Sequence, residues 1–248
     1  MSMDRSIYVS TSGVKQTMDA MSTSANNLAN VSTTGFRAQI DSFSSVPVTG
    51  DGMNTRAMAV SATVSTDFKP GPIQQTGNPL DVAIRGEGWI AVTGKDGKEA
   101  YTRNGSFEVD KTGVLITATG QKVQGDGGAI NIPQDTTLLI GADGTVSGTQ
   151  TGIASNTVQV LGRIKLVNPP TKSLVRGDDG TFRLTSGGTA PASAQVRLES
   201  GALEGSNVNP VEEMVNMISL ARQFEMHTKM LQSMDTQTQK ADSLLSLT

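Results

Sequence analysis

NNLANVSTTGFRAQ, residues 26–39, determines how the N-terminal part of the chain folds. It contains three asparagines, a serine, two threonines and a glycine, and no charge occurs from Ser22 to Phe36. Asn30 and Gly35 tolerate positive φ best, and the hydroxyls between them can hydrogen-bond the local backbone. The stretch therefore predicts that a preceding helix stops between Asn30 and Gly35, and that Phe36 is an apolar anchor at the start of the following segment.

A period of seven residues precedes this stop. The first set of positions is apolar: Ile7, Val14, Met21 and Leu28. A second set falls between them: Thr11, Met18, Ala25 and Val31 or Ser32. Apolar residues at this spacing form a narrow stripe along a helix, as in coiled coils. We expect a helix from about Asp4 to Val31.

The same period returns at the C-terminal end. One set of positions comprises Met217, Phe224, Leu231, Thr238 and Leu245. The second set comprises Leu220 or Ala221, His227 or Thr228, Met234 and Ala241. Asn209 before Pro210, followed by two acids, is typical of a helix start, because Asn caps and Pro fits the first turn. We expect a helix over about 210–246.

The middle of the chain, from about residue 80 to 204, follows a different pattern. DVAIRGEGWIAVTGKDGKEAYTRNGSFEVDKTGVLITATGQKVQG, residues 81–125, alternates short runs of Val, Ile, Thr and Phe with glycine turns. Turns at intervals of about eight to twelve residues indicate a β-meander or barrel. Trp89 lies in an alternating run, so we expect it in the core of this β region.

These patterns predict an α+β fold. Long N- and C-terminal helices form an antiparallel coiled-coil-like pair, and an all-β central domain is inserted between them. The predicted segments are an N-terminal axial helix and turn motif over 1–40, an extended linker over 41–79, a β-rich domain over 80–204, and a C-terminal axial helix over 205–248. Within the linker, a β segment at 57–66 is an option.

The surface of the N-terminal helix predicts partners. Its only charges are Asp4, Arg5, Lys15 and Asp19, and the remaining polar residues are Ser, Thr, Asn and Gln. An uncharged polar surface can be buried if its amides and hydroxyls find hydrogen bonds. The helices are therefore expected to pack against other copies or related chains. The expected packing positions are Ile7, Val14, Met21, Leu28, Val31, Met217, Phe224, Leu231, Met234 and Leu245.

Composition excludes several classes of function. The chain has 248 residues, a net charge of −3, no cysteine and one histidine, His227. Basic clusters typical of nucleic-acid binding are missing from the sequence, as are an ordinary signal peptide and an apolar run long enough to span a membrane. A lone histidine cannot supply a catalytic dyad, and Asp178-Asp179-Gly180 is typical of a hairpin turn. We expect no enzyme activity, no cofactor and no metal.

Three stretches resemble the flagellar basal-body rod, hook and axial proteins. They are SANNLANVSTTGFRAQ (24–39), PGPIQQTGNPLDVAIRGEGWIAV (70–92) with YTRNGSF and GVLITATGQKVQG, and ESGALEGSNVNPVEEMVNMISLARQFEMHTKML (199–231). Together they cover nearly the whole chain in order. The residues that match the family's N-terminal motif are Asn26, Asn27, Leu28, Ala29, Asn30, Thr34, Gly35 and Phe36.

The resemblance implies a structural subunit of the rod. The opening residues, FRAQIDSF (36–43) and the length are most similar to a protein of the proximal rod; the distal rod protein is the alternative. It implies assembly with other copies and with proximal and distal rod proteins, and export by the flagellar type III apparatus without a cleaved signal. It places the chain in the basal body, within the periplasm. A carbohydrate- or peptidoglycan-binding β module with helical arms is the other hypothesis.

Overall fold

The computed structural model describes residues 2–47, 57–150 and 158–245. They form two compact units. The helical unit comprises Met1–Asn30, Ala38–Asp67 and Val208–Thr248, and the β unit comprises Val31–Arg37 and Phe68–Asn207. Each unit is therefore assembled from segments that are far apart in the sequence.

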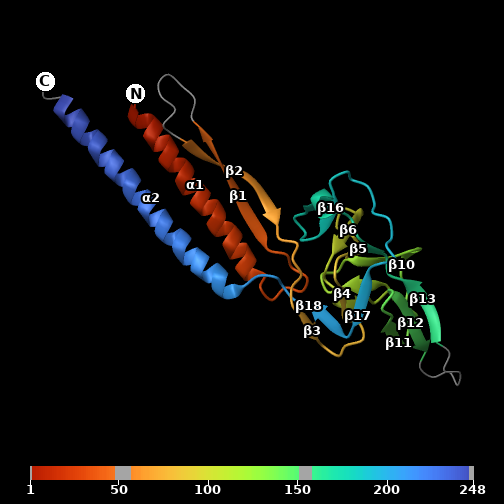
Figure 1. Ribbon diagram of the computed structural model, residues 1–248. Helices are drawn as coiled ribbons and strands as arrows, with labels where there is room; N and C mark the ends of the chain where they lie inside the picture. The colour runs from red at the N-terminus through yellow and green to blue at the C-terminus, as the bar shows by residue number, and fades with distance from the viewer. Residues whose placement is uncertain (1, 48–56, 151–157, 246–248) are drawn as a thin grey trace. The chain divides into compact units, whose positions relative to one another are not determined.

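The helical unit contains two helices and one hairpin. Its elements are α1 (Ser2–Ala29), β1 (Gln39–Pro47), β2 (Ala57–Thr66) and α2 (Pro210–Leu245). The strands pair antiparallel, with Gln39 opposite Thr66 and a register shift between Ser42 and Phe43. Figure 1 shows α1 between α2 and the hairpin.

The start of α2 follows from its sequence, and the predicted start at Pro210 is confirmed. The Asn209 side chain accepts hydrogen bonds from the backbone N–H of Val211 at 3.1 Å and of Glu212 at 3.4 Å. It thereby satisfies donors that the first helical turn leaves without partners. Glu212 and Glu213 lie in that turn, where the helix dipole favours negative charge.

The fold class predicted from the sequence is wrong. The described residues contain two α-helices of 28 and 36 residues beside a large β-rich body, rather than a long coiled-coil-like pair carrying a β insertion on a linker. A coiled coil buries its apolar stripe. Among the described side chains, no hydrophobic residue of α1 or α2 is buried.

The extended linker is the second part of this correction. Residues 39–47 and 57–66 pair as β1 and β2, which confirms the optional β segment at 57–66. The Ser- and Thr-rich composition suggested a loop, but Thr and Val favour strands once a partner strand supplies the hydrogen bonds. Ile73–Gln75, also in the predicted linker, forms β3 and pairs with β18 (Ala202–Glu204).

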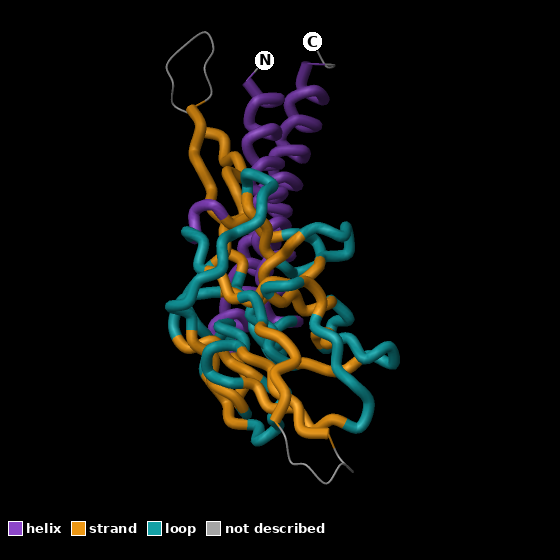
Figure 2. Tube along the Cα trace, turned by 90° about the vertical axis from the view of Figure 1, so that its right-hand side faces the viewer, coloured by secondary structure: helices purple, strands orange, loops and turns teal. Residues whose placement is uncertain are grey.

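The β unit consists of short antiparallel strands. In chain order they are β3 (Ile73–Gln75), β4 (Val82–Arg85), β5 (Trp89–Thr93), β6 (Glu99–Thr102), β7 (Phe107–Val109), β8 (Leu115–Thr117), β9 (Lys122–Gly125), β10 (Gly128–Ala129), β11 (Thr136–Ile140), β12 (Thr145–Gln150), β13 (Val158–Arg163), β14 (Leu166–Val167), β15 (Leu174–Arg176), β16 (Phe182–Leu184), β17 (Arg197–Ser200) and β18 (Ala202–Glu204). One helical turn, η1 (Thr171–Ser173), precedes β15. Figure 2 shows that strands and loops make up almost all of this unit.

The largest sheet runs in the order β15-β16-β6-β5-β9-β8-β7, with β10 beside β9 and β14 beside β5. Three smaller sheets are β11-β12-β13, β17-β4 and β18-β3. This arrangement agrees with the expected β-meander in its short strands and hairpin turns, and it places β18, the strand before α2, beside β3.

Two hydrophobic clusters form the core of the β unit. The larger one includes Ile90, Val92, Phe107 and Leu115. The smaller one gathers Trp89, Tyr101, Phe182 and their neighbours, with the ring centroids of Trp89 and Phe182 4.7 Å apart. The predicted core position of Trp89 is confirmed, since its exposed fraction is 3%.

Tyr101 makes the stability of the β unit sensitive to alkaline pH. Its hydroxyl donates to Glu99 Oε1 at 2.9 Å and accepts from the Ala190 N–H at 2.7 Å. Burial raises the pKa of Tyr101 to about 12, above its ordinary value of 10.0, because the interior disfavours the phenolate. The unfolded state therefore loses the proton first, so the stabilising contribution is present below about pH 10 and is lost as the pH rises towards about 12.

The measurement is the free energy of unfolding from denaturant titrations on either side of pH 10. We expect the free-energy difference between the unmodified chain and Tyr101→Phe to change over this interval, because only the unmodified chain carries the phenol. A difference that is independent of pH would contradict this assignment.

Candidate functional site

The buried side of α1 is lined by short polar side chains. Within the described residues they are Ser10, Thr17, Ser24 and Asn27. The Thr17 hydroxyl donates to the Gly13 carbonyl at 2.9 Å, so it needs no partner from another element. A Cβ at Gly13 would lie 3.0 Å from Cε1 of His227, so glycine allows the close approach of α2 at this point.

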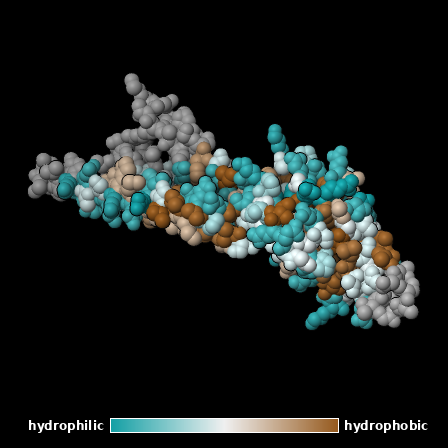
Figure 3. Space-filling view, turned by 60° about the horizontal axis from the view of Figure 1, so that its bottom comes forward, coloured by the Kyte–Doolittle hydropathy of each residue, from teal (hydrophilic) through white to brown (hydrophobic). Residues whose placement is uncertain are grey.

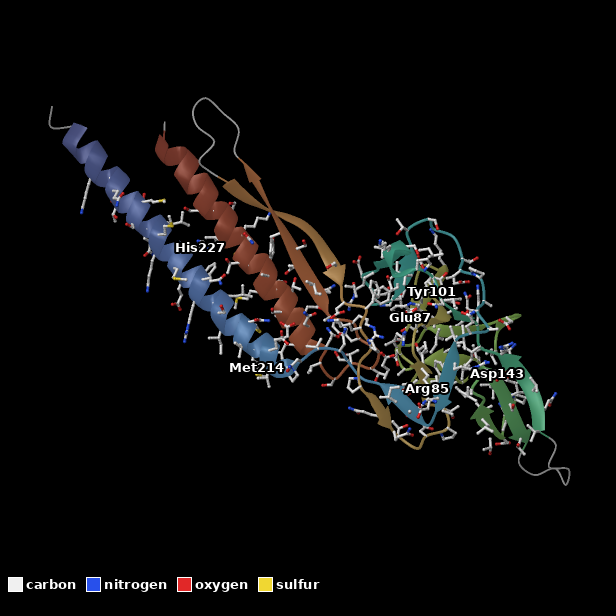
Figure 4. The ribbon with its side chains drawn as sticks, viewed as in Figure 1. Arg85, Glu87, Tyr101, Asp143, Met214 and His227 are labelled. Carbon is white, nitrogen blue, oxygen red and sulfur yellow. The ribbon has the colours of Figure 1, made fainter. Side chains whose placement is uncertain are left out.

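The two helices run antiparallel. Near one end, the Ser10 hydroxyl donates to Sδ of Met234 at 3.8 Å. Near the other, Asn27 Nδ2 donates to Glu213 Oε1 at 2.9 Å. Figure 4 shows His227 on the side of α2 that faces α1, and Met214 near the start of α2. These contacts establish the antiparallel register, because Ser10 near the start of α1 lies beside Met234 late in α2, and Asn27 near the end of α1 lies beside Glu213 at the start of α2.

The predicted packing positions that the structure describes are partly buried. In the helical unit they are Val14, Met21, Leu28, Met217, Phe224, Leu231 and Met234. Val31 is also partly buried but belongs to the β unit. Ile7 and Leu245 lie outside the residues whose side chains the structure describes. The role of these residues in contacts between subunits stays a prediction.

A second apolar surface escaped the sequence analysis. It lies on the exposed side of α2 and comprises Val211, Met214, Val215, Ile218, Met226 and Met230. Their exposed fractions run from 50% to 67%, and on α1 Met18 is 56% exposed. Figure 3 shows hydrophobic side chains at the surface of the helical unit. Clustered exposed apolar side chains mark interaction sites more often than scattered ones do.

The sequence did carry a signal for this surface. Val211, Met214, Val215 and Ile218 follow the i, i+3, i+4, i+7 spacing of one helix face. The period of seven residues instead predicted a packing stripe through Met217 and Leu231. α2 therefore has apolar residues on two sides, and only the stripe through Met217 is turned towards α1.

The asparagines of the N-terminal motif close the end of α1. Asn27 Nδ2 donates to the Gln39 carbonyl at 2.9 Å, and its Oδ1 accepts from the Gln39 N–H at 2.8 Å. The Asn30 side chain donates to the Asn26 carbonyl at 2.9 Å. Helix α1 ends at Ala29 and Asn30 forms the turn, near the stop expected between Asn30 and Gly35. Amides are useful here because each one both donates and accepts.

The later motif residues belong to the β unit. Gly35 has φ of 69° and donates its N–H to the Glu204 carbonyl at 2.7 Å, while Thr34 before it is partly buried. Phe36 is buried, with the Arg176 guanidinium carbon 4.4 Å from the ring centroid. The predicted role of Phe36 as an apolar anchor is therefore confirmed.

Beside Phe36 lies a buried ionic cluster that the sequence analysis missed. Glu204 accepts from Arg37 Nη2 at 2.6 Å and from Arg103 Nη1 at 2.9 Å, and the Gly71 N–H donates to the same carboxylate at 3.0 Å. Burial lowers the pKa of Arg103, and the Glu204 carboxylate opposes that shift. Nε and Nη1 of Arg37 and Nε of Arg103 are buried without a hydrogen-bond partner. The cluster thus depends on one carboxylate.

Within the described residues, no three His, Cys, Asp or Glu side chains come together as a metal site would require. No α-helix in the same residues is both long and apolar enough to cross a membrane. The pKa of Asp179 lies well below its usual range, because its carboxylate accepts hydrogen bonds from Arg183. This pair braces the turn that joins β15 and β16.

Three family profiles match the chain in order. "Flagella basal body rod protein" matches residues 7–37, "Flagellar hook protein FlgE/F/G D1 domain" matches 83–148, and "Flagellar basal body rod FlgEFG protein C-terminal" matches 199–244. They include α1 with its motif, the central strands of the β unit, and α2 with the strand before it.

Full-length relatives carry matching names. The flagellar basal-body rod protein FlgF of Salmonella typhimurium is 43% identical over 99% of this chain and 100% of its own length. That of Escherichia coli is 44% identical over the same shares. The flagellar basal-body rod protein FlgG of Bacillus subtilis is 33% identical over 94% of this chain and 96% of its own.

Proposed function

The chain belongs to the family of flagellar basal-body rod proteins, and we propose that it is a structural subunit of the rod that assembles through its two terminal helices. FlgF relatives match it better than the FlgG relative does, at 43% and 44% identity against 33%. A place in the proximal rod follows from that order. The alternative is that the chain corresponds to FlgG of the same family, to which the identity is lower.

One observation carries the proposal. The exposed apolar surface of α2, from Val211 to Met230, has no cover within the described subunit. Burying apolar area stabilises association by roughly 25 cal/mol per Å² before the entropic cost of assembly is subtracted. A subunit that joins a polymer is stabilised there when such a surface is buried against a neighbour, whereas an isolated soluble protein leaves the same surface exposed to water.

The finer parts of the proposal rest on the family. Rod subunits that interlock through helices form a hollow axle that transmits torque and surrounds an export channel. Partners are then other copies and the proximal and distal rod proteins. Passage through the flagellar type III apparatus would place the chain in the periplasm without a cleaved signal peptide. Such a subunit works mechanically and performs no catalysis.

A carbohydrate- or peptidoglycan-binding β module is set aside. The similarity to rod proteins spans both helices as well as the β unit, and the full-length relatives align over nearly the whole chain. A binding module with dispensable arms would match through its β region alone.

Val215→Asp combined with Ile218→Asp tests the proposal. Both side chains are exposed in the subunit, so the change should alter its free energy of unfolding by no more than about 0.5 kcal/mol. In the rod it would bury two charges without partners, at several kcal/mol. We expect the variant to be exported and folded but absent from purified basal bodies, and its cells not to swim.

Gln232→Asp is the matched control, because Gln232 is also exposed on α2 and its neighbours on the helix surface, Thr228, Lys229, Asp235 and Thr236, are polar. Immunoblots of basal bodies and swim diameters in cells that lack the native gene supply the measurements. Normal incorporation of the double variant would show that this surface takes no part in assembly.

A further inference from the structure

Methionine is confined to one of the two units. The sequence contains 11 methionines and no cysteine, and none of the methionines lies in the segments 31–37 and 68–207 that form the β unit. All of them therefore belong to the segments of the helical unit. The methionines whose side chains the structure describes are Met18, Met21, Met214, Met217, Met226, Met230 and Met234. The sulfur of this chain is thus concentrated beside its proposed assembly surface.

These methionines fall into two groups that differ in exposure. The exposed methionines, with exposed fractions from 50% to 63%, are Met18, Met214, Met226 and Met230. The partly buried methionines are Met21, Met217 and Met234. A thioether is oxidised more readily where solvent reaches it, so the two groups are expected to react at different rates.

The three exposed methionines of α2 belong to the apolar surface that begins at Val211. Met214 lies one helical turn from Val211 and one turn from Ile218. Met226 lies one turn from Met230. A thioether packs as an apolar group, whereas a sulfoxide is polar and needs a hydrogen-bond donor wherever it is buried. The aliphatic neighbours of Met214 have no donor to offer.

The oxidation needs no group from the chain besides the sulfur. The thioether sulfur attacks one oxygen of hydrogen peroxide, the O–O bond breaks and an S–O bond forms. The other oxygen leaves as water and takes both protons, so the sulfur loses two electrons and the peroxide gains them. Methionine sulfoxide reductases reverse the change. Because the chain has no cysteine, no thiol within it competes for the oxidant.

We propose that Met214, Met226 and Met230 form an oxidation site of the free subunit, and that their conversion to sulfoxides by hydrogen peroxide keeps the subunit out of the rod. The inference rests on the proposed function and adds a chemical condition for assembly. A chain that is already incorporated has this surface covered and is protected from the same oxidant. Oxidation therefore acts on the subunits that still await assembly.

Peptide mapping by mass spectrometry tests the site in the purified full-length chain. After a short exposure to hydrogen peroxide, we expect sulfoxide at Met214, Met226 and Met230 well before it forms at the partly buried methionines. This measurement is independent of the proposed function. Oxidation of both groups at the same rate would overturn the proposed site.

Competition within one cell tests the effect on assembly. The unmodified chain is produced together with a Met214→Leu/Met226→Leu/Met230→Leu chain, because leucine is apolar, similar in volume and resistant to oxidation. A pulse of hydrogen peroxide is given, and the ratio of the two chains in purified basal bodies is measured by mass spectrometry. We expect this ratio to shift at least about fivefold towards the leucine chain, relative to the same cells without peroxide. Any effect of leucine itself cancels in the comparison.

The matched control replaces the same number of methionines in the partly buried group, as Met21→Leu/Met217→Leu/Met234→Leu. Its ratio to the unmodified chain should be the same with and without peroxide, because its exposed methionines remain. A peroxide response that is absent from the α2 variant, or equal in both variants, would overturn the proposal.

The unmodified chain covers the case in which a leucine variant fails to assemble. After the pulse, we expect at least about fivefold less sulfoxide at Met214, Met226 and Met230 in chains from basal bodies than in unassembled chains. Equal sulfoxide content in the two pools would contradict the proposal and leave the proposed function intact. Absence of the unmodified chain from basal bodies without peroxide would instead overturn the proposed function.

Discussion

Glu204→Gln is expected to lower the free energy of unfolding of the β unit by about 3–5 kcal/mol. The carboxylate of Glu204 is 1% exposed and holds the guanidinium groups of Arg37 and Arg103 at 2.6 Å and 2.9 Å. Removing its charge leaves both arginines buried without an ion pair among the described residues, in surroundings that already leave some of their N–H groups without partners. Desolvated charges without a counterion are among the most destabilising changes to a folded protein.

Trp89 provides the measurement. It is the single tryptophan of the chain and is buried in the β unit, so its fluorescence reports the unfolding of that unit. Glu199→Gln is the matched control, because Glu199 lies on β17, the strand that precedes β18 in the chain, and accepts from Gln75 at an exposed site. We expect the control to cost less than about 1 kcal/mol. An equally small loss for Glu204→Gln would show that the ionic cluster contributes little.

Gly35→Ala should be nearly as damaging, at more than about 3 kcal/mol. Two effects add. The residue has φ of 69°, a conformation that costs an L-residue roughly 1–2 kcal/mol. The new Cβ would also lie 2.4 Å from the carbonyl carbon of Arg103 and 2.6 Å from its oxygen, which is closer than atoms can approach. The backbone beside the ionic cluster would have to move.

Gly77→Ala separates the two effects. Gly77 has φ of 74°, and a Cβ there meets no atom within 4 Å. This control should therefore show only the conformational cost, roughly 1–2 kcal/mol. Denaturant unfolding followed by Trp89 fluorescence gives both values. If Gly35→Ala costs no more than Gly77→Ala, the close approach to Arg103 is relieved by small shifts and does not constrain the fold.

Local patterns predicted the local structure well. Turn residues at regular spacing indicated the strands of the β unit, Asn209 and Pro210 marked the start of α2, and the amide-rich stretch marked the end of α1. In each case the residues that decide the structure are neighbours in the chain. Hydrogen bonds from a side chain to a nearby backbone group depend on little else.

The predictions from the sequence were wrong or incomplete where residues far apart in the chain determine the structure. The β1–β2 hairpin consists of two segments whose Ser- and Thr-rich composition resembles that of a loop. Only their pairing with each other makes them strands. The coiled-coil prediction took a period of seven residues as evidence of a buried stripe, but the buried side chains of α1 are Ser10, Thr17, Ser24 and Asn27. No local signal connects Arg37, Arg103 and Glu204, because burial of a charge is set by the tertiary fold.

The ionic cluster also governs the order in which the chain can fold. Arg37 and Glu204 are separated by 167 positions in the sequence, so their contact closes one of the longest loops in the molecule. Folding rates fall as contacts become less local. During synthesis the N-terminus emerges first, so Arg37 appears early and must wait for residue 204. Until then the arginine remains hydrated and the ionic cluster incomplete, so the β unit can finish folding only after most of the chain has been made.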